Sequence, residues 1–148
     1  MYTPHTVTIY NLRENANFEM ESNITILRGV FLDISQGANI TKSGLANADA
    51  ATLFVPFDVL AVDGYTETEK EYVTPKEYAA LNNTSGYWTI ATGGETSPVG
   101  CFFVKGEVVD ASGYSALRQK YDHVFDVTTV DLRDFGSAGM EHWQVGGK

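Results

Sequence analysis

The sequence predicts a mainly β protein, a small antiparallel β-barrel or sandwich with one or two short helices and a long loop between early strands. Apolar and polar residues alternate with period two in about six short runs, as they do in half-buried strands. Turn-forming residues separate these runs, and only two segments carry helix signals. Because no repeat or linker divides the 148 residues, we expect a single domain, 1–148.

The N-terminal part supplies the first three expected strands. One is predicted at Thr6–Tyr10, and a second begins near Asn23 after a polar connection. Gly29 interrupts this second run, and a glycine inside a strand pattern indicates a bulge or a bend. The third strand, Thr52–Leu60, contains Pro56, whose missing N–H predicts an edge or a bulged position.

A long polar loop, Ser35–Ala51, separates the runs Gly29–Ile34 and Thr52–Leu60. Loops of this length in a compact domain are usually functional or disordered. We expect this one to contact a partner or a neighbouring subunit and to become ordered on binding; the alternative is a disordered surface loop. The residues expected to make this contact are Gln36, Asn39, Lys42, Ser43, Leu45, Asn47 and Asp49.

A capping box marks the first expected helix. After the acidic segment 63–73, which we expect to be exposed, Thr74 has the N-cap position and Pro75 the first helical position. Glu77 stands where its side chain can return a hydrogen bond to the backbone of the cap. The pattern predicts one or two helical turns that end at Asn82–Asn83.

The C-terminal part holds the remaining predicted elements. A fourth strand is expected at Gly86–Thr92 and a fifth, bent strand at Cys101–Asp110. Ser112–Tyr121 has the spacing of a short helix. The strongest strand pattern in the chain covers residues 123–135, and we expect residues 136–148 to be a flexible tail or an added edge strand.

Composition excludes several classes of function. The formal net charge of -9 argues against a phosphate-binding surface, and the ten basic residues form no stripe, so we expect no sequence-specific nucleic-acid binding. No segment approaches the roughly 20 apolar residues that span a bilayer, and the N-terminus lacks a signal-peptide pattern. We expect a soluble protein that is made in the cytoplasm and does not bind membranes.

The residue types that carry chemistry are scattered. Cys101 is the only cysteine and is expected to pack as a small apolar core residue, the alternative being a reactive thiolate. His5, His123 and His142 lie far apart in the sequence and show no metal-ligand spacing. No nucleophile and base can be paired, which disfavours a small hydrolase. We expect no metal, no cofactor and no enzymatic activity.

An alternative function is a β-sandwich module that binds carbohydrate or another surface ligand. In such a module Tyr87, Trp88 or Trp143 would be exposed and clustered. Alternation directs only one residue of the Tyr87–Trp88 pair outward, and we expect Trp88 to lie in the core.

Three blocks of the sequence carry a family resemblance: Val7–Leu12 (VTIYNL), Gly29–Val59 (GVFL…SGLANADAATLFVPFDV) and Tyr72–Gly100 (YVTPKEYAAL…YWTIATGG…PVG). In their order they resemble the small neck proteins of tailed phages, of the head-closure or head–tail connector type. The positions that match the family pattern are Ala48, Asp49, Val55, Pro56, Trp88, Ile90, Gly94, Val99 and Gly100. The chain departs from that pattern at Glu95, where the family often has aspartate.

The resemblance implies a non-enzymatic structural subunit of a phage or prophage particle. Copies of such a β-barrel form a ring beneath the portal and close the DNA-filled head, so the virion neck is the implied location. The implied partners are other copies of the chain, the portal or adaptor, and tail proteins. The long loop would contact neighbours or line the channel, and an acidic lumen would let DNA pass without sticking.

Overall fold

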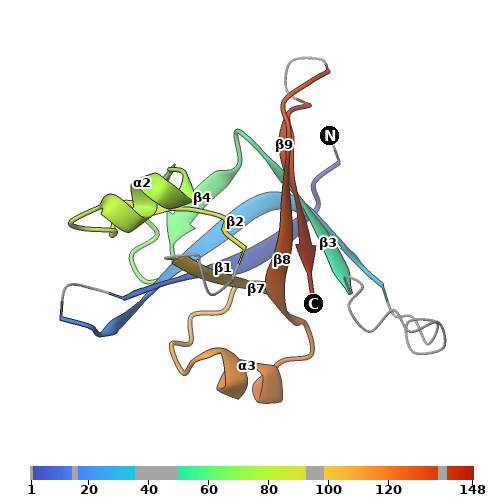
Figure 1. Cartoon of the computed structure of the whole chain (residues 1–148). Coiled ribbons are helices and arrows are strands. Elements are labelled where there is room, and N and C mark those ends of the chain that lie inside the picture. The colour runs from blue at the N-terminus through green and yellow to red at the C-terminus, as the bar shows by residue number, and fades with distance from the viewer. Residues whose placement is uncertain (1, 15–16, 36–49, 93–98, 137–139) are drawn as a thin grey trace.

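Figure 1 shows the computed structural model of the chain, which describes residues 2–14, 17–35, 50–92, 99–136 and 140–148. Within these residues the protein is mainly β, and six strands close into an antiparallel barrel. One further strand extends the sheet, and a separate pair of two-residue strands and two short helices complete the fold. The predicted fold class is therefore confirmed, as a barrel.

The elements follow one another along the chain as β1 (His5–Glu14), β2 (Met20–Ile34), β3 (Ala51–Pro56), β4 (Leu60–Asp63), β5 (Glu71–Tyr72), α2 (Pro75–Ala80), β6 (Tyr87–Trp88), β7 (Val99–Lys105), α3 (Tyr114–Lys120), β8 (Val124–Arg133) and β9 (His142–Gly147). In space the order around the ring is β1, β7, β8, β9, β3 and β2, and β2 pairs again with β1. β5 and β6 form a separate parallel pair.

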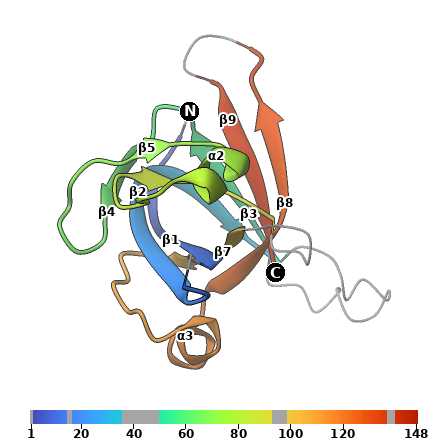
Figure 2. The same ribbon diagram turned by 60° about the vertical axis from the view of Figure 1, so that its left-hand side comes forward.

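Two long strands close the barrel by changing partners where they bend (Figure 2). β2 pairs with β1 and β4 through its first half and with β3 through Phe31–Ile34. The change follows Gly29, which has φ +94° and lies at a register shift against β1. β8 likewise changes from β7 to β9 near a register shift at Val127–Thr129. Bulges bend and twist a strand, which allows a sheet to close into a ring. The predicted bulge at Gly29 is confirmed.

Neighbouring strands change several of the predicted boundaries. The two runs on either side of Gly29 form one strand, β2, whereas the predicted strand Thr52–Leu60 is divided into β3 and β4 after Pro56. β3 is not at an edge, because it pairs with both β2 and β9. Pro56 is tolerated there because it is the last residue of the strand.

The C-terminal segment forms β9, so the expectation of a flexible tail or an edge strand is wrong for residues 142–147. β9 lies between β3 and β8, and the side chain of Val145 is fully buried. A Cβ atom at Gly147 would lie 2.8 Å from Phe103 Cζ and 2.8 Å from Phe125 Cβ. Close packing between Phe103 and Phe125 therefore requires glycine at this position.

The predicted strand Gly86–Thr92 is a strand only at β6. Beyond β6, Asn11 Nδ2 donates to the carbonyl oxygen of Thr89 at 2.8 Å, and Asn11 Oδ1 accepts from the Thr89 N–H at 3.2 Å. A side-chain amide offers the same donor and acceptor as a peptide group. The Asn11 side chain therefore makes the two hydrogen bonds to Thr89 that the backbone of a neighbouring strand would otherwise make.

Both predicted helices are present. α2 starts as predicted at Pro75, and the Oγ1 atom of its N-cap Thr74 accepts from the Glu77 N–H at 3.3 Å. The Glu77 carboxylate accepts a hydrogen bond from the Thr74 hydroxyl at 2.9 Å. α3 lies within the predicted segment, and its buried residue is Leu117.

Two apolar clusters define an inside and an outside of the barrel. The larger cluster fills the interior and includes Trp88 and Phe103. The smaller cluster joins Tyr10 and Phe102 on the outer face to Leu117 of α3. The covered sheet, formed by β1, β7 and the first half of β2, thus has apolar neighbours on both faces. The open sheet, formed by β3, β9 and the second halves of β2 and β8, contributes to the interior cluster only.

We predict that Gly147→Ala destabilises the protein by about 1–3 kcal/mol, because the added methyl group overpacks the site between Phe103 and Phe125. Urea unfolding measures this free energy. Gly86→Ala is the matched control: nothing lies within 4 Å of the added Cβ, and a change within about 0.5 kcal/mol is expected. Equal stabilities of the two variants would contradict the packing described for β9.

Candidate functional site

A row of aromatic rings crosses the outer surface of the open sheet. We call Tyr2, His5, Phe31, Phe54 and His142 the aromatic face. Their ring centroids are 6.1 Å apart for Tyr2 and Phe31, 5.5 Å for His5 and Phe31, 5.7 Å for Phe31 and Phe54, and 5.7 Å for Phe54 and His142. Phe31 and Phe54 are also direct partners in the β2–β3 register. The row therefore unites residues from the N-terminal segment and four strands.

The Gly29 bulge decides that Phe31 points outward. Before the bulge, Leu27 is the β2 residue that packs inside the barrel, and after it Val30 and Leu32 do so. The shift by one residue exchanges the two faces of the strand, so Phe31 lies on the outer face. On β3, Phe54 stands between Leu53 and Val55, whose side chains are fully buried. Both phenylalanines are thus half-exposed beside a well-filled core.

The aromatic face is hollowed. Tyr2, Phe31, Phe54 and His142 line a concavity of about 400 Å³, and Tyr2 is 75% exposed. Phe31 lies at the centre of the face, because its ring is next to those of Tyr2, His5 and Phe54.

Hydrogen bonds set the orientation of the two histidine rings of this face. His5 Nδ1 accepts from the Leu32 N–H at 3.0 Å, so the proton of the neutral ring is on Nε2. His142 Nδ1 lies 3.0 Å from the carbonyl oxygen of Met140, to which it donates. Both imidazole rings pack against a phenylalanine ring of the aromatic face, His5 against Phe31 and His142 against Phe54. Among the residues that the structure describes, no group of three His, Cys, Asp or Glu side chains is placed to hold a metal ion.

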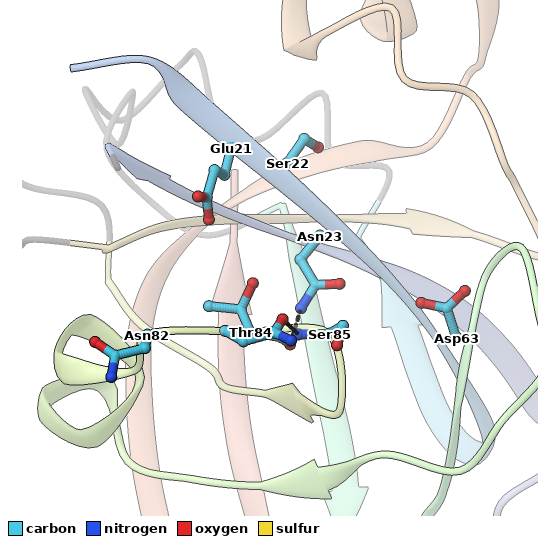
Figure 3. A pocket seen from close by; sticks show the side chains of 8 residues that line it. Glu21, Ser22, Asn23, Asp63, Asn82, Thr84 and Ser85 are labelled. Carbon is cyan, nitrogen blue, oxygen red and sulfur yellow. Dashed lines mark hydrogen bonds between the residues drawn. The ribbon is translucent and has the colours of Figure 1, made fainter. Parts of the chain in front are cut away.

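A second surface feature is a polar groove between β2, the β4–β5 turn and the segment that follows α2. Its lining residues, seven of which are labelled in Figure 3, are Glu21, Ser22, Asn23, Asp63, Asn82, Asn83, Thr84 and Ser85, and its volume is about 340 Å³. Asn23 reaches across it: Nδ2 lies 3.0 Å from the carbonyl oxygen of Thr84 and 2.8 Å from that of Tyr87. These bonds attach the segment after α2 to the barrel.

Lys70 is buried at the inner side of this groove. Its ammonium group lies 2.6 Å from Asn23 Oδ1, 3.0 Å from Thr25 Oγ1, 3.1 Å from Asp63 Oδ1 and 3.1 Å from the carbonyl oxygen of Ile24. Burial lowers the pKa of Lys70, although Asp63 opposes the shift. All donors of the ammonium are used within the chain, so Lys70 is a structural cation. The expectation that segment 63–73 is exposed is wrong at Lys70, because Asn23, Ile24 and Thr25 of β2 surround its ammonium group together with Asp63.

Arg13 attaches α2 to the same network. Its guanidinium Nη1 donates to the carbonyl oxygens of Tyr78 and Leu81 at the end of the helix, and its Nη2 lies 3.2 Å from Glu21 Oε2. Together, Asn11, Arg13, Asn23 and Lys70 form what we call the polar network. The polar groups of this network bond to one another and to the backbone of the segment around α2. We therefore interpret the groove as the place where this segment is attached to the barrel.

The other candidates from the sequence have structural roles. Cys101 is buried, and burial raises the pKa of its thiol to about 12, so the expected core position is confirmed. Trp88 is 2% and Trp143 7% exposed, and both rings pack against Tyr72. The core position expected for Trp88 is confirmed. The exposed, clustered tryptophans that a carbohydrate module requires are not found at these positions.

The residues predicted to contact a partner, Gln36, Asn39, Lys42, Ser43, Leu45, Asn47 and Asp49, lie outside the described residues. The structure describes both ends of their segment. The Ser35 N–H donates to the carbonyl oxygen of Ala50 at 2.7 Å, and the Ala50 N–H donates to that of Gly147 at 2.7 Å. The strands β2 and β3 are therefore joined by hydrogen bonds up to the base of the insertion 36–49.

The described residues define a small β-barrel with the aromatic face on the outside of its open sheet. The chain belongs to a family of unknown function, DUF6751, whose model matches residues 2–148. No curated protein and no solved structure matches the chain. Within the described residues, no helix is long and apolar enough to cross a membrane.

We predict that Lys70→Met lowers the free energy of unfolding by about 3 kcal/mol, because Asp63 and Asn23 lose their buried cationic partner. Chemical denaturation measures the change. Lys76→Met, on the exposed side of α2, is the control and is expected to stay within about 0.5 kcal/mol. A loss no larger than that of the control would show that the polar network does not hold the segment.

Acid should weaken the contact that Asp63 makes. Burial raises the pKa of its carboxyl, but the N–H groups of Thr66 and Tyr65 together with Lys70 outweigh this and lower the pKa below 3.8. A depressed carboxyl pKa stabilises the fold above pH 3.8, and this stabilisation is lost as pH falls through the lower folded value. We predict that the stability difference between the wild type and Asp63→Asn is constant near neutral pH and shrinks below pH 3.8. Unfolding curves across this range test it; a difference that grows in acid would contradict it.

Proposed function

We propose that this protein is a non-enzymatic structural subunit of a phage or prophage particle. In this proposal it forms rings as a head-closure or head–tail connector and acts through contacts between subunits in the virion neck. The observation that carries the proposal is the closed base of the insertion 36–49. Because Ser35 and Ala50 are already hydrogen-bonded, two turn residues would suffice to connect β2 and β3. The barrel does not need the insertion, so the insertion is available for contacts with partners.

The aromatic face supports the same proposal. It includes Phe31 on β2 and Phe54 on β3, the two strands that carry the insertion, and both phenylalanines are only half-buried although the core beside them is filled. In an assembly, such side chains gain burial from a neighbouring subunit. The net charge of -9 fits a channel lining that repels the phosphate backbone of passing DNA.

The direct test is assembly with a portal protein. Purified protein is mixed with portal and tail proteins of the same particle and examined by light scattering and electron microscopy. We expect rings on the portal, with DNA free to pass through the lumen. Absence of binding to every portal and tail component would overturn the proposal, whereas a monomer in the absence of partners would not.

We further predict that replacing residues 36–49 by Asn-Gly abolishes portal binding and leaves the barrel folded. A shorter loop lowers the entropy cost of closure, so stability is expected to stay the same or rise by about 1–2 kcal/mol. Thermal unfolding and a portal pull-down measure the two effects.

A matched variant keeps the length of the insertion but replaces its seven predicted contact residues by Gly and Ser. It is expected to fold and to lose binding as the deletion does. Normal portal binding by both variants would show that the insertion is not part of the interface with the portal.

A further inference from the structure

The outer half of β8 has one edge without a partner strand. β8 pairs with β7 only through residues 124–126, and with β9 through residues 127–133. Among the described residues, no strand pairs with the other edge of segment 129–133. The edge of β4, by contrast, is covered by segment 68–70, which bonds to Ala61 and Asp63. Figure 1 shows the outer end of the β8–β9 hairpin rising above the other strands. A strand edge with unpaired N–H and C=O groups is a template for a further strand.

Hydrogen bonds at the two ends of β9 show which of its residues bond to β8. The carbonyl oxygens of Glu141 and Gly147 accept hydrogen bonds on the side of β3, whereas Lys148 exchanges two hydrogen bonds with Asp126 of β8. The backbone groups of successive residues in a strand point alternately to its two neighbours. The even-numbered residues of β9 therefore bond to β8.

This alternation also orients the backbone of β8. Asp131 and Arg133 are the register partners of two even-numbered β9 residues, so their backbone groups bond to β9. The N–H and C=O groups of Val130 and Leu132 therefore point to the edge without a partner. Both side chains line a hollow of about 360 Å³, and Leu132 is 57% exposed. The edge thus offers backbone hydrogen bonds beside an exposed apolar side chain, which are the two requirements for adding a strand.

The sequence Asp131-Leu132-Arg133 is complementary to itself. When two copies of β8 pair antiparallel about a two-fold axis at Leu132, each Asp131 stands opposite the Arg133 of the other copy. If the axis were at Asp131, two carboxylates would stand opposite each other. Asp134, the next carboxylate in the chain, stands opposite Val130 when the axis is at Leu132. Charge therefore favours this register for a second copy of the chain.

The ion pair within each chain leaves both charged groups accessible. Arg133 Nη2 lies 3.8 Å from Asp131 Oδ2, and the two side chains are 40% and 55% exposed. A second copy in this register gives each group another neighbour of opposite charge. The four charged groups around the axis then alternate in sign.

We propose that two copies of this chain pair through the free edge of β8, antiparallel and with the two-fold axis at Leu132. Each Leu132 side chain then packs against that of the other copy beside the hollow. Such a contact is complete with two copies. The inference goes beyond the proposed function, since it uses neither the insertion nor the aromatic face and concerns the purified chain alone.

Reversal of single charges tests the register. Asp131→Arg places arginines opposite each other, and Arg133→Asp places carboxylates opposite each other, in both cases twice per dimer. We expect sedimentation to show dimerisation of each variant weakened by about tenfold or more. An equal mixture of the two variants should restore it, because arginine then stands opposite aspartate at every position. Asp122→Arg, on the exposed surface after α3, is the matched control and should dimerise like the wild type.

The charge reversals also separate association from folding. The side chains of Asp131 and Arg133 are partly exposed, so both variants are expected to keep a melting temperature close to that of the wild type. A mixture that dimerises no better than the single variants overturns the proposal. A wild type that stays monomeric up to about 1 mM overturns it as well.

Cysteine cross-linking measures the same register independently. Asp131→Cys and Arg133→Cys are made in separate chains, mixed and oxidised. Directly opposite residues of an antiparallel pair have Cα atoms about 4.5–5.5 Å apart, within reach of a disulfide, and the buried Cys101 does not compete. We expect the mixed disulfide in clear excess over both self-disulfides, whose cysteines are two residues out of register. Equal yields would contradict the axis at Leu132.

These outcomes are distinct from failure of the proposed function. A dimer with the expected charge dependence that binds no portal or tail protein would leave the contact standing and overturn the function. A wild type that is monomeric alone, and that loses portal binding on Asp131→Arg, would assign the edge of β8 to the portal. That result would overturn the contact between copies and support the function.

Discussion

Barrel closure depends on the bend of β2 at Gly29. This strand has to pair with β1 and β4 in its first half and with β3 in its second half, and the bulge makes the change of partner possible. The same one-residue shift exchanges the faces of the strand. Val30 and Leu32 therefore fill the interior, and Phe31 joins the outer surface. A single constraint thus produces both the closed fold and the centre of the aromatic face.

The interior of the barrel is chemically divided. Along β1, the inward-facing positions change from Val7 and Ile9 to Asn11 and Arg13. The apolar part packs as a core, and the polar part holds the α2 segment through hydrogen bonds to its backbone. Asn23 and Lys70 continue this polar part: they are hydrogen-bonded to each other, to the carbonyl oxygen of Tyr87 and to β2. The polar groove therefore has a structural role, and the aromatic face is a separate surface of the barrel.

The proposed function assigns contacts between subunits to the insertion 36–49 and to the aromatic face, whose Phe31 and Phe54 lie on β2 and β3, the two strands that carry the insertion. In a closed ring, neighbouring copies would cover these surfaces.

Local pattern was sufficient for the features that depend on neighbours in sequence. Alternation revealed the strands and the core position of Trp88, Thr74–Glu77 revealed the start of α2, and Gly29 revealed the bulge. It was insufficient for the central place of β9, the burial of Lys70 and the aromatic face. Each of these depends on residues far apart in the chain, such as Ala51 opposite Gly147 or Asn23 beside Lys70. Periodicity tells which side chains share a face of one strand, but only the closed barrel decides which strands, and hence which faces, meet.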